Sequence, residues 1–326
     1  MKSSIDWLRI GVANYFGQDK TLWDERLLWF FTHEHELEAI AGDADKYYLY
    51  VKSVHAYREV MKGEPTKFIM DLDACSSGIS ILSASMGCRI GCENTNLLPT
   101  GERRDIYTTG LKVMNDLLGS DNAIERDIIK EAIMTAFYGS RANPKRLFGE
   151  DTPELKAFYD MLVIVAPGAW EMMQIIQRCW NPEATEYRWK MADGYQVVTP
   201  VTDVFSQKLE IPDVGAYTYN TTIKCTKDFG VSLAANITQS IEGSICRELI
   251  RMCNIDGFNI MTIFDSFWCS PNHVEQMRAN YNHIMLTVHK GKMMEDILRQ
   301  ITNTNNTLVQ KEDLGDEFMN AEYSLS

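Results

Sequence analysis

Residues 67–79, KFIMDLDACSSGI, join a short apolar run to an acidic end. The run predicts a strand over 67–73, because it is short and turn-forming residues follow it. Asp73 then stands at the end of that strand, and Asp71 points the same way by strand alternation. Either aspartate alone is typical of a turn or cap, so spacing does not choose between them.

A second acidic turn lies near the other end of the chain, in FNIMTIFDSFWCS at 258–270. Its pattern predicts two short strands about a tight turn that contains Asp265. Mg²⁺ prefers carboxylates together with water and substrate phosphates. Phosphoryl transfer to a 3′-hydroxyl uses two such ions. The hypothesis is that Asp73 and Asp265 form one metal site.

The third candidate part of the site is a helix predicted from Asp121 to Gly139, with the sequence DNAIERDIIKEAIMTAFYG. Asp121 can cap its start and Gly139 can end it. Arg126 and Lys130 are four residues apart and share a face, and Tyr138 projects within about a third of the circumference from them. Two cations and an aromatic ring suit a nucleoside triphosphate, although for this helix alone a solvated basic face is the simpler interpretation.

The rest of the chain mixes both kinds of pattern. Residues 1–66 predict helices, and residues 185–230 show strand and turn signals. Residues 293–326 are expected to form a polar, acidic tail. We therefore expect an α+β fold that is mainly helical, with a small antiparallel sheet carrying the two aspartates.

Composition bounds the function. The chain has 326 residues, of which 45% are hydrophobic and 24% charged, as in a soluble globular protein. The net charge of −13 argues mildly against a free-standing nucleic-acid binder. The cysteines lack zinc-site spacing. No leader or membrane-spanning run is found, so we expect an intracellular, cytoplasmic protein without membrane contact.

Three motifs carry a resemblance. DACSSGI at 73–79 resembles the motif Asp-Gly-Ser-Cys-Ser-Gly-Ile, and FDS at 264–266 resembles His-Asp-Ser. RDIIKEAIMTAFYG at 126–139 has the pattern Arg-x3-Lys-x7-Tyr-Gly. In this order they resemble the phage-type single-subunit RNA polymerases, a family that includes the mitochondrial enzymes. Weaker similarities lie at 7–14, 24–26, 96–107 and 322–326.

The resemblance implies the palm and fingers of a right-hand polymerase. Residues 1–115 would be the first part of the palm with the first catalytic motif. Residues 116–230 would be the fingers, with the nucleotide-binding helix 121–138 and a reduced specificity-loop region. Residues 231–326 would be the second part of the palm, with the second catalytic motif, and the C-terminal foot.

The resemblance also implies roles for single residues. Asp73 and Asp265 would hold two Mg²⁺ ions, and Ala74 would offer its backbone carbonyl to metal. Lys130 and Tyr138 would complete the catalytic set. The nucleotide-binding residues would be Arg126, Lys130, Tyr138, Gly139, Tyr107, Arg9 and Gly78.

Some positions depart from the family pattern. Phe264 and Gln239 stand where the family has histidines that contact the primer or product. DNA polymerases with the same fingers motif carry a glutamate, five residues after the first aspartate, that blocks a 2′-hydroxyl. Gly78 occupies that position here and leaves room for ribose, which favours RNA synthesis.

The expected partners follow from the resemblance. They are a DNA template, the RNA product and rNTPs. The family's N-terminal region and thumb have no counterpart here, so we expect a second, smaller polypeptide to supply them. That arrangement resembles the large subunit of the split heterodimeric RNA polymerase II of N4-like phages. Because the specificity loop is shortened, we also expect a single-stranded-DNA recruitment factor as a partner. Two alternatives remain, a non-catalytic polymerase-like nucleic-acid-binding subunit and a family A-like DNA polymerase or primase.

Overall fold

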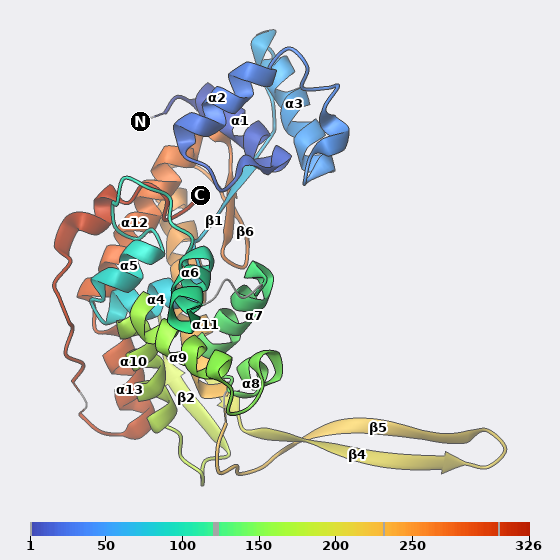
Figure 1. Cartoon of the computed structure of the whole chain (residues 1–326), viewed down its shortest axis with the longest axis vertical. Coiled ribbons are helices and arrows are strands. Elements are labelled where there is room, and N and C mark those ends of the chain that lie inside the picture. Colours follow the sequence, from blue (N-terminus) through green and yellow to red (C-terminus); the bar gives the residue numbers. More distant parts are fainter. Residues whose placement is uncertain (1, 120–123, 231, 306) are drawn as a thin grey trace.

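The computed structural model describes residues 2–119, 124–230, 232–305 and 307–326. The chain is mainly helical, with one three-stranded and two two-stranded antiparallel sheets, which confirms the predicted α+β class. Figure 1 shows the N-terminal helices at one end, a helical body in the middle and a long hairpin extending from the other end. None of the helices in the described ranges is both long and apolar enough to cross a membrane.

The N-terminal helices surround a core of their own. Leu8, Phe30 and Tyr57 are among its buried side chains. The helices are α1 (Ser4–Ala13), α2 (Trp23–His33) and α3 (Tyr47–Met61), with short turns η1 (Asn14–Gln18) and η2 (Ala41–Asp43) between them. The helical pattern predicted for residues 1–66 is thus confirmed.

The central sheet has the strand order β1-β7-β6 and is antiparallel throughout. Its strands are β1 (Met70–Asp73), β6 (Met261–Ile263) and β7 (Ser266–Cys269). Met70 and Leu72 of β1 are buried, and so are Phe267 and Cys269 of β7. Because side chains alternate across a strand, this burial fixes the register, which sets Asp73 opposite Ser266.

The body is built around α4, which is buried from Gly78 to Ser85. Its small and apolar side chains allow neighbouring helices to pack on every side. The other helices of the body are α5 (Arg89–Asn94), α6 (Ile106–Leu118), α7 (Arg126–Phe137), α8 (Ala142–Phe148), α9 (Pro153–Val165), α10 (Pro167–Arg178), α11 (Ser232–Ile255), α12 (Val274–Lys290) and α13 (Met293–Thr302), with α4 itself spanning Ser77–Ser85.

Two details differ from the sequence prediction. Helix α7 begins at Arg126 with Glu125 at its N-cap, and Asp121, the predicted cap, lies outside the described residues. The stretch after residue 292 contains α13, whose Met294 and Ile297 are buried. The apolar spacing in MMEDILRQIT indicates this helix, but the polar residues around it hid the pattern.

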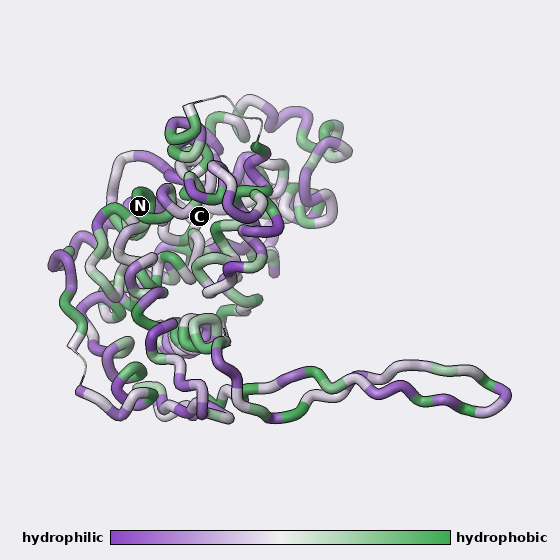
Figure 2. The backbone as a smooth tube through the Cα atoms, turned by 60° about the horizontal axis from the view of Figure 1, so that its bottom comes forward, coloured by the Kyte–Doolittle hydropathy of each residue, from purple (hydrophilic) through white to green (hydrophobic). Residues whose placement is uncertain are grey.

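Two hairpins follow α10. Strands β2 (Glu186–Lys190) and β3 (Gln196–Pro200) pair with each other and pack against the body through Tyr187 and Trp189. Strands β4 (Thr202–Ile211) and β5 (Gly215–Lys224) form the long hairpin, whose ten residue pairs lie almost wholly in solvent. Figure 2 shows hydrophilic and hydrophobic residues intermixed along this hairpin.

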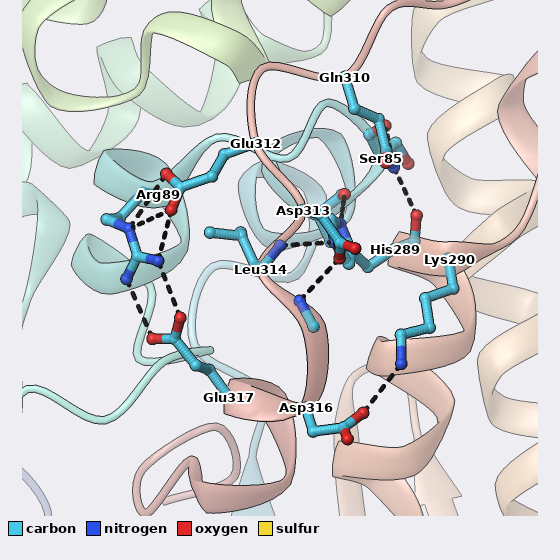
Figure 3. A network of polar contacts seen from close by, with 12 residues as sticks. Ser85, Arg89, His289, Lys290, Gln310, Glu312, Asp313, Leu314, Asp316 and Glu317 are labelled. Atoms are coloured by element: carbon cyan, nitrogen blue, oxygen red, sulfur yellow. Dashed lines mark hydrogen bonds and ion pairs between the residues drawn. The ribbon is translucent and has the colours of Figure 1, made fainter.

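The segment 310–317 is anchored to α4, α5 and α12 by polar contacts (Figure 3). The Arg89 guanidinium donates to Glu312 Oε1 (2.6 Å) and to Glu317 Oε1 (2.8 Å). Buried His289 accepts from the Leu314 N–H at Nε2 (3.0 Å), so its Nδ1 carries the proton shared with a main-chain carbonyl of α4. These contacts hold the segment that leads, through η4 (Gly315–Asn320), to the end of the chain; η3 (Pro271–His273) precedes α12.

Candidate active site

The end of the central sheet brings Asp73 and Asp265 together. Asp265 lies in the two-residue turn between β6 and β7, next to Ser266, which is opposite Asp73. Cα atoms of opposed antiparallel residues lie about 4.5–5.5 Å apart. The N–H of Ala74 donates to the Asp265 carbonyl (3.0 Å), which extends the pairing by one step. Two carboxylates from opposite ends of the chain therefore share one end of the sheet.

The structure distinguishes Asp73 from Asp71. The Asp71 carboxylate accepts a hydrogen bond from the Tyr15 hydroxyl (2.5 Å) and lies 3.9 Å from the Lys46 ammonium. It is engaged with the N-terminal helices, and it does not line the cavity described below. Asp73 is exposed to that cavity. The neighbours of each carboxylate, and not strand spacing, decide the choice.

The electrostatic surroundings of Asp73 suit a cation. Partial withdrawal from solvent raises the pKa of its carboxyl, and the nearby carboxylates of Asp71 and Asp265 raise it further. A hydrogen bond from Ser266 and the charge of Lys46 act in the opposite direction. A divalent cation between Asp73 and Asp265 would remove the repulsion that disfavours the ionised carboxyl.

The donor set also fits magnesium chemistry. No group of three or more His, Cys, Asp or Glu side chains with metal-site geometry occurs within the described ranges. A closed zinc-type centre is therefore absent from that part of the chain. Mg²⁺, in contrast, is commonly held by one or two carboxylates while water and substrate phosphates complete its shell.

Phe264 stands out in the turn that carries Asp265. Its φ is 54°, a left-handed backbone conformation, and its side chain is 90% exposed. For a residue with a Cβ this conformation costs on the order of 1–2 kcal/mol. Backbone strain and an exposed aromatic ring have no benefit for the packing of this turn. Such strain clusters at functional sites, and here it presents both side chains of the turn to the cavity.

A cavity of about 780 Å³ opens over the two aspartates. One wall is the segment from Asp73 to Ile79, and the facing walls come from α7, α11 and the start of α6. Five basic and five acidic residues line it, although the whole chain carries −13. The charged side chains of the cavity are thus balanced, whereas the chain as a whole is acidic. The predicted site residues that line it are Asp73, Ala74, Gly78, Tyr107, Arg126, Lys130, Tyr138, Gln239, Phe264 and Asp265.

Helix α7 presents its two cations to the cavity. Arg126 donates to the Asp105 carboxylate from Nε (2.8 Å) and Nη2 (2.5 Å). Burial would raise the pKa of Asp105, but hydrogen bonds from Thr108 and Arg126 hold it below the usual range. The Tyr107 ring lies 5.6 Å from the Arg126 guanidinium carbon and 5.8 Å from the Lys130 ammonium. Lys130 itself is exposed, so its charge can meet an anion in the cavity.

Tyr138 lies where α7 faces α11 and the start of α4. A Cβ added to Gly78 would lie 3.0 Å from the Tyr138 hydroxyl oxygen, so the absent side chain is what admits the ring. The hydroxyl donates to Glu242 Oε1 (3.2 Å), and the Ser77 hydroxyl donates to the same oxygen (2.9 Å). Burial raises the pKa of Tyr138, and the Glu242 carboxylate adds to that rise.

Two predicted nucleotide contacts do not reach the cavity. Arg9 lies among the N-terminal helices, where Nη1 bonds Asp6 (3.0 Å) and the guanidinium carbon lies 4.8 Å from the Phe31 ring centre. It does not line the cavity. Gly139 ends α7 with a φ of 92°, and its carbonyl accepts from Gln177 Nε2 (3.1 Å). Gly139 thus forms the turn that follows Tyr138, and it does not line the cavity.

The match with known proteins agrees with this geometry. A family model described as DNA-dependent RNA polymerase matches residues 1–147, which include Asp73 and all of α7. The DNA-directed RNA polymerase of Pseudomonas phage phiKMV is 26% identical over 355 residues, covering 89% of this chain and 43% of that enzyme. The chain is thus similar to the phage-type RNA polymerases.

A second relative within the phage-type RNA polymerase family is the DNA-directed RNA polymerase of Enterobacteria phage T3. It is 20% identical over 395 residues, which cover 91% of this chain and 44% of that enzyme. The chain therefore spans less than half the length of either phage polymerase. Both comparisons support the resemblance predicted from the three motifs.

The cavity of the present chain also has lining residues that the motifs did not indicate. Glu242 follows Gln239 by three residues on α11, so helical spacing alone could have placed both on one face. Asp105 is the N-cap of α6. Other additions carry no local signal, because only the folded chain brings them to the cavity. They are Asp19, Lys20, Arg103, Arg104 and Ser326.

Proposed function

We propose that this chain is the catalytic part of a DNA-directed RNA polymerase that adds rNTPs to the 3′-hydroxyl of RNA. The observation that carries the proposal is the cavity where Asp73, Asp265 and the Arg126–Lys130–Tyr138 face of α7 converge. Carboxylates for metal and cations for phosphate are the two parts that nucleotidyl transfer requires. Similarity to the phage-type RNA polymerases supports the same reaction.

Asp73 and Asp265 would hold two Mg²⁺ ions, with the Ala74 carbonyl as a further ligand. When bound, the ions supply activation of the attacking 3′-oxygen and stabilisation of the leaving pyrophosphate. The protein's own part is to fix both carboxylates at one end of a rigid sheet. The main-chain bond from Ala74 to Asp265 and the pairing of Asp73 with Ser266 do this.

Helix α7 would bind the incoming triphosphate. Lys130 places its ammonium beside the phosphates, where it offsets their charge and the charge that develops on the leaving group. Arg126, held by Asp105, keeps its guanidinium directed along the Tyr107 ring. Tyr138, whose ring fits against Gly78, would then lie beside the sugar. Gln239 and Phe264 would contact the primer or product end from α11 and the turn.

The division into palm and fingers follows the cavity walls. Residues 1–115 and 231–326 would form the palm, because together they supply all three strands of the central sheet. Residues 116–230 would form the fingers, since they contain α7 and the β4–β5 hairpin in the specificity-loop region. The last residues would be the foot, because Ser326 N–H donates to the Asp73 carbonyl (3.0 Å).

The partner proposal rests on exposed apolar side chains near the central sheet. They are Ile69, which precedes β1, and Phe31 and Tyr48 on the N-terminal helices. A second, smaller polypeptide that supplies a thumb would bind there. A single-stranded-DNA recruitment factor would deliver the template.

Primer extension tests the function. Purified chain, with any co-purifying polypeptide retained, is given a DNA template, a labelled primer and Mg²⁺, with rNTPs or dNTPs in parallel. Extension with rNTPs that is lost in Asp265→Ala supports the proposal. Extension with dNTPs only would favour a DNA polymerase. No extension with either, together with retained binding of primed template, would favour a non-catalytic subunit.

A further inference from the structure

Glu242 is a carboxylate inside the candidate active site with no role in the chemistry described so far. It lies on α11, lines the cavity, and is half-buried. Its Oε1 accepts two hydrogen bonds, one from the Ser77 hydroxyl (2.9 Å) and one from the Tyr138 hydroxyl (3.2 Å). The carboxylate thus joins α11, the start of α4 and the end of α7 at a single atom.

The bond to Tyr138 decides what that tyrosine can do. A phenol has one hydrogen to donate and lone pairs to accept. Because its hydrogen points to Glu242, the Tyr138 oxygen faces any other neighbour as an acceptor. A ribose 2′-hydroxyl is a donor and can fill that acceptor, whereas a deoxyribose offers nothing there.

The Tyr138 hydroxyl is also tightly confined by the start of α4. A Cβ added to Gly78 would lie 3.0 Å from the hydroxyl oxygen and 3.2 Å from Cζ. Ser77, the residue before Gly78, is the second donor to Glu242. The position of the Tyr138 hydroxyl is therefore set by the absent side chain of Gly78 and by the Glu242 carboxylate.

The role does not depend on the ionisation of Glu242. Burial raises the pKa of its carboxyl and the Asp265 carboxylate adds to the rise, while the bonds from Ser77 and Tyr138 oppose it. Oε1 accepts from Tyr138 as a carboxylate oxygen, and it still accepts as the carbonyl oxygen of a protonated acid. Replacement by glutamine retains such an oxygen, and replacement by methionine removes it.

We propose that Glu242 is the positioning residue for sugar selection: it takes the Tyr138 hydroxyl hydrogen and so makes Tyr138 an acceptor for the 2′-hydroxyl of an incoming ribonucleotide. The inference rests on the proposed polymerase function. Glu242 acts through Tyr138 and contacts neither metal nor phosphate in this role.

The test compares kcat/KM for ATP and 2′-deoxyATP in primer extension for wild type, Glu242→Met and Glu242→Gln. We expect Glu242→Met to lower the ribose preference about five- to tenfold, the value of one neutral hydrogen bond, mainly through KM for ATP. Glu242→Gln keeps the acceptor and should keep the preference. Tyr138→Phe should lose it, and adding Glu242→Met to Tyr138→Phe should change nothing more.

Glu248→Gln is the matched control. Glu248 lies on the same helix and pairs with Arg251 (2.5 Å) at the surface, so its replacement should leave the ratio unchanged. Melting temperatures of all variants report folding. An unchanged ratio in Glu242→Met, while Tyr138→Phe loses preference, overturns the inference and leaves the polymerase function standing. A wild type that prefers dATP also overturns it, because Glu242 would then obstruct ribose.

A second measurement needs no activity. Equilibrium binding of ATP and 2′-deoxyATP in the presence of Mg²⁺, followed by intrinsic tryptophan fluorescence, should show tighter ATP binding that Glu242→Met removes. If neither nucleotide is incorporated but ATP still binds more tightly through Glu242, the polymerase proposal fails, and Glu242 with Tyr138 remains a ribose-selective nucleotide site. Equal affinities in wild type contradict the inference whatever the extension assay shows.

Discussion

The cavity over Asp73 and Asp265 and the β4–β5 hairpin are built in opposite ways. The cavity draws its lining from segments up to 307 residues apart, from Asp19 to Ser326. The hairpin pairs ten residues with ten others across a short turn and lies almost wholly in solvent. Contacts in the cavity are non-local and partly buried, whereas those in the hairpin are local. A change in the cavity should therefore affect several elements at once, and a change in the hairpin should stay there.

The largest expected effect is loss of a metal-binding carboxylate. Asp265→Ala should reduce primer extension by more than about 100-fold, because even residues that only support a metal ligand account for about 10–100-fold. Steady-state extension with rNTPs measures this. Activity within a few-fold of wild type would show that the turn is not the metal site. Asp71→Asn is the control, because Asp71 lies on β1 but does not line the cavity. It should lose far less activity than Asp265→Ala.

Lys130→Ala should have the next largest effect. Removal of one charge that stabilises the transition state costs about 10²–10³-fold in rate in other enzymes, and we expect kcat/KM to fall by about 100-fold. The exposed Lys112 on α6 provides a matched control, and Lys112→Ala should change little. Equal losses in both variants would point to diffuse attraction of nucleic acid instead of a triphosphate site.

A smaller effect concerns stability without metal. The pKa of Asp73 is raised in the folded protein, so its ionisation disfavours the fold, and stability from this group falls as pH rises above the usual range for aspartate. Asp73→Asn should thus raise the melting temperature of chelator-treated protein at neutral pH, by about 1–2 °C. Added Mg²⁺ should stabilise wild type more than the variant. Calorimetry at pH 4 and pH 7 checks the sign, because the difference between the proteins should shrink at pH 4.

Truncation of the hairpin should have the smallest effect. Replacing residues 206–220 with an Asn-Gly turn keeps Phe205 opposite Thr221 and removes a segment that pairs only with itself. Melting temperature and extension of a pre-annealed primer should remain within about twofold of wild type, since the hairpin is far from the cavity lining. A large loss of either would contradict the division drawn between the two regions.

Local patterns predicted most of the elements. The strand before Asp73, the hairpin around Asp265 and the helix carrying Lys130 have short-range signals of alternation, tight turns and helical spacing. The start of α7 was wrong, because Glu125 holds the N-cap position while Asp121 lies outside the described residues. Helix α13 was missed, since its apolar stripe sits in a strongly polar stretch.

The sequence by itself determined the resemblance to phage-type RNA polymerases, the α+β class and the principal residues of the cavity, because motifs and periodicity depend on neighbouring residues. Only the tertiary structure showed that Asp71 is bonded to Tyr15, placed Arg9 outside the cavity and brought Glu242 to Tyr138. Those outcomes depend on partners such as Tyr15 and Phe31, which lie far from each site residue in the chain. The chemistry of a side chain follows from its residue type alone. Which side chains become its neighbours depends on packing across the whole fold.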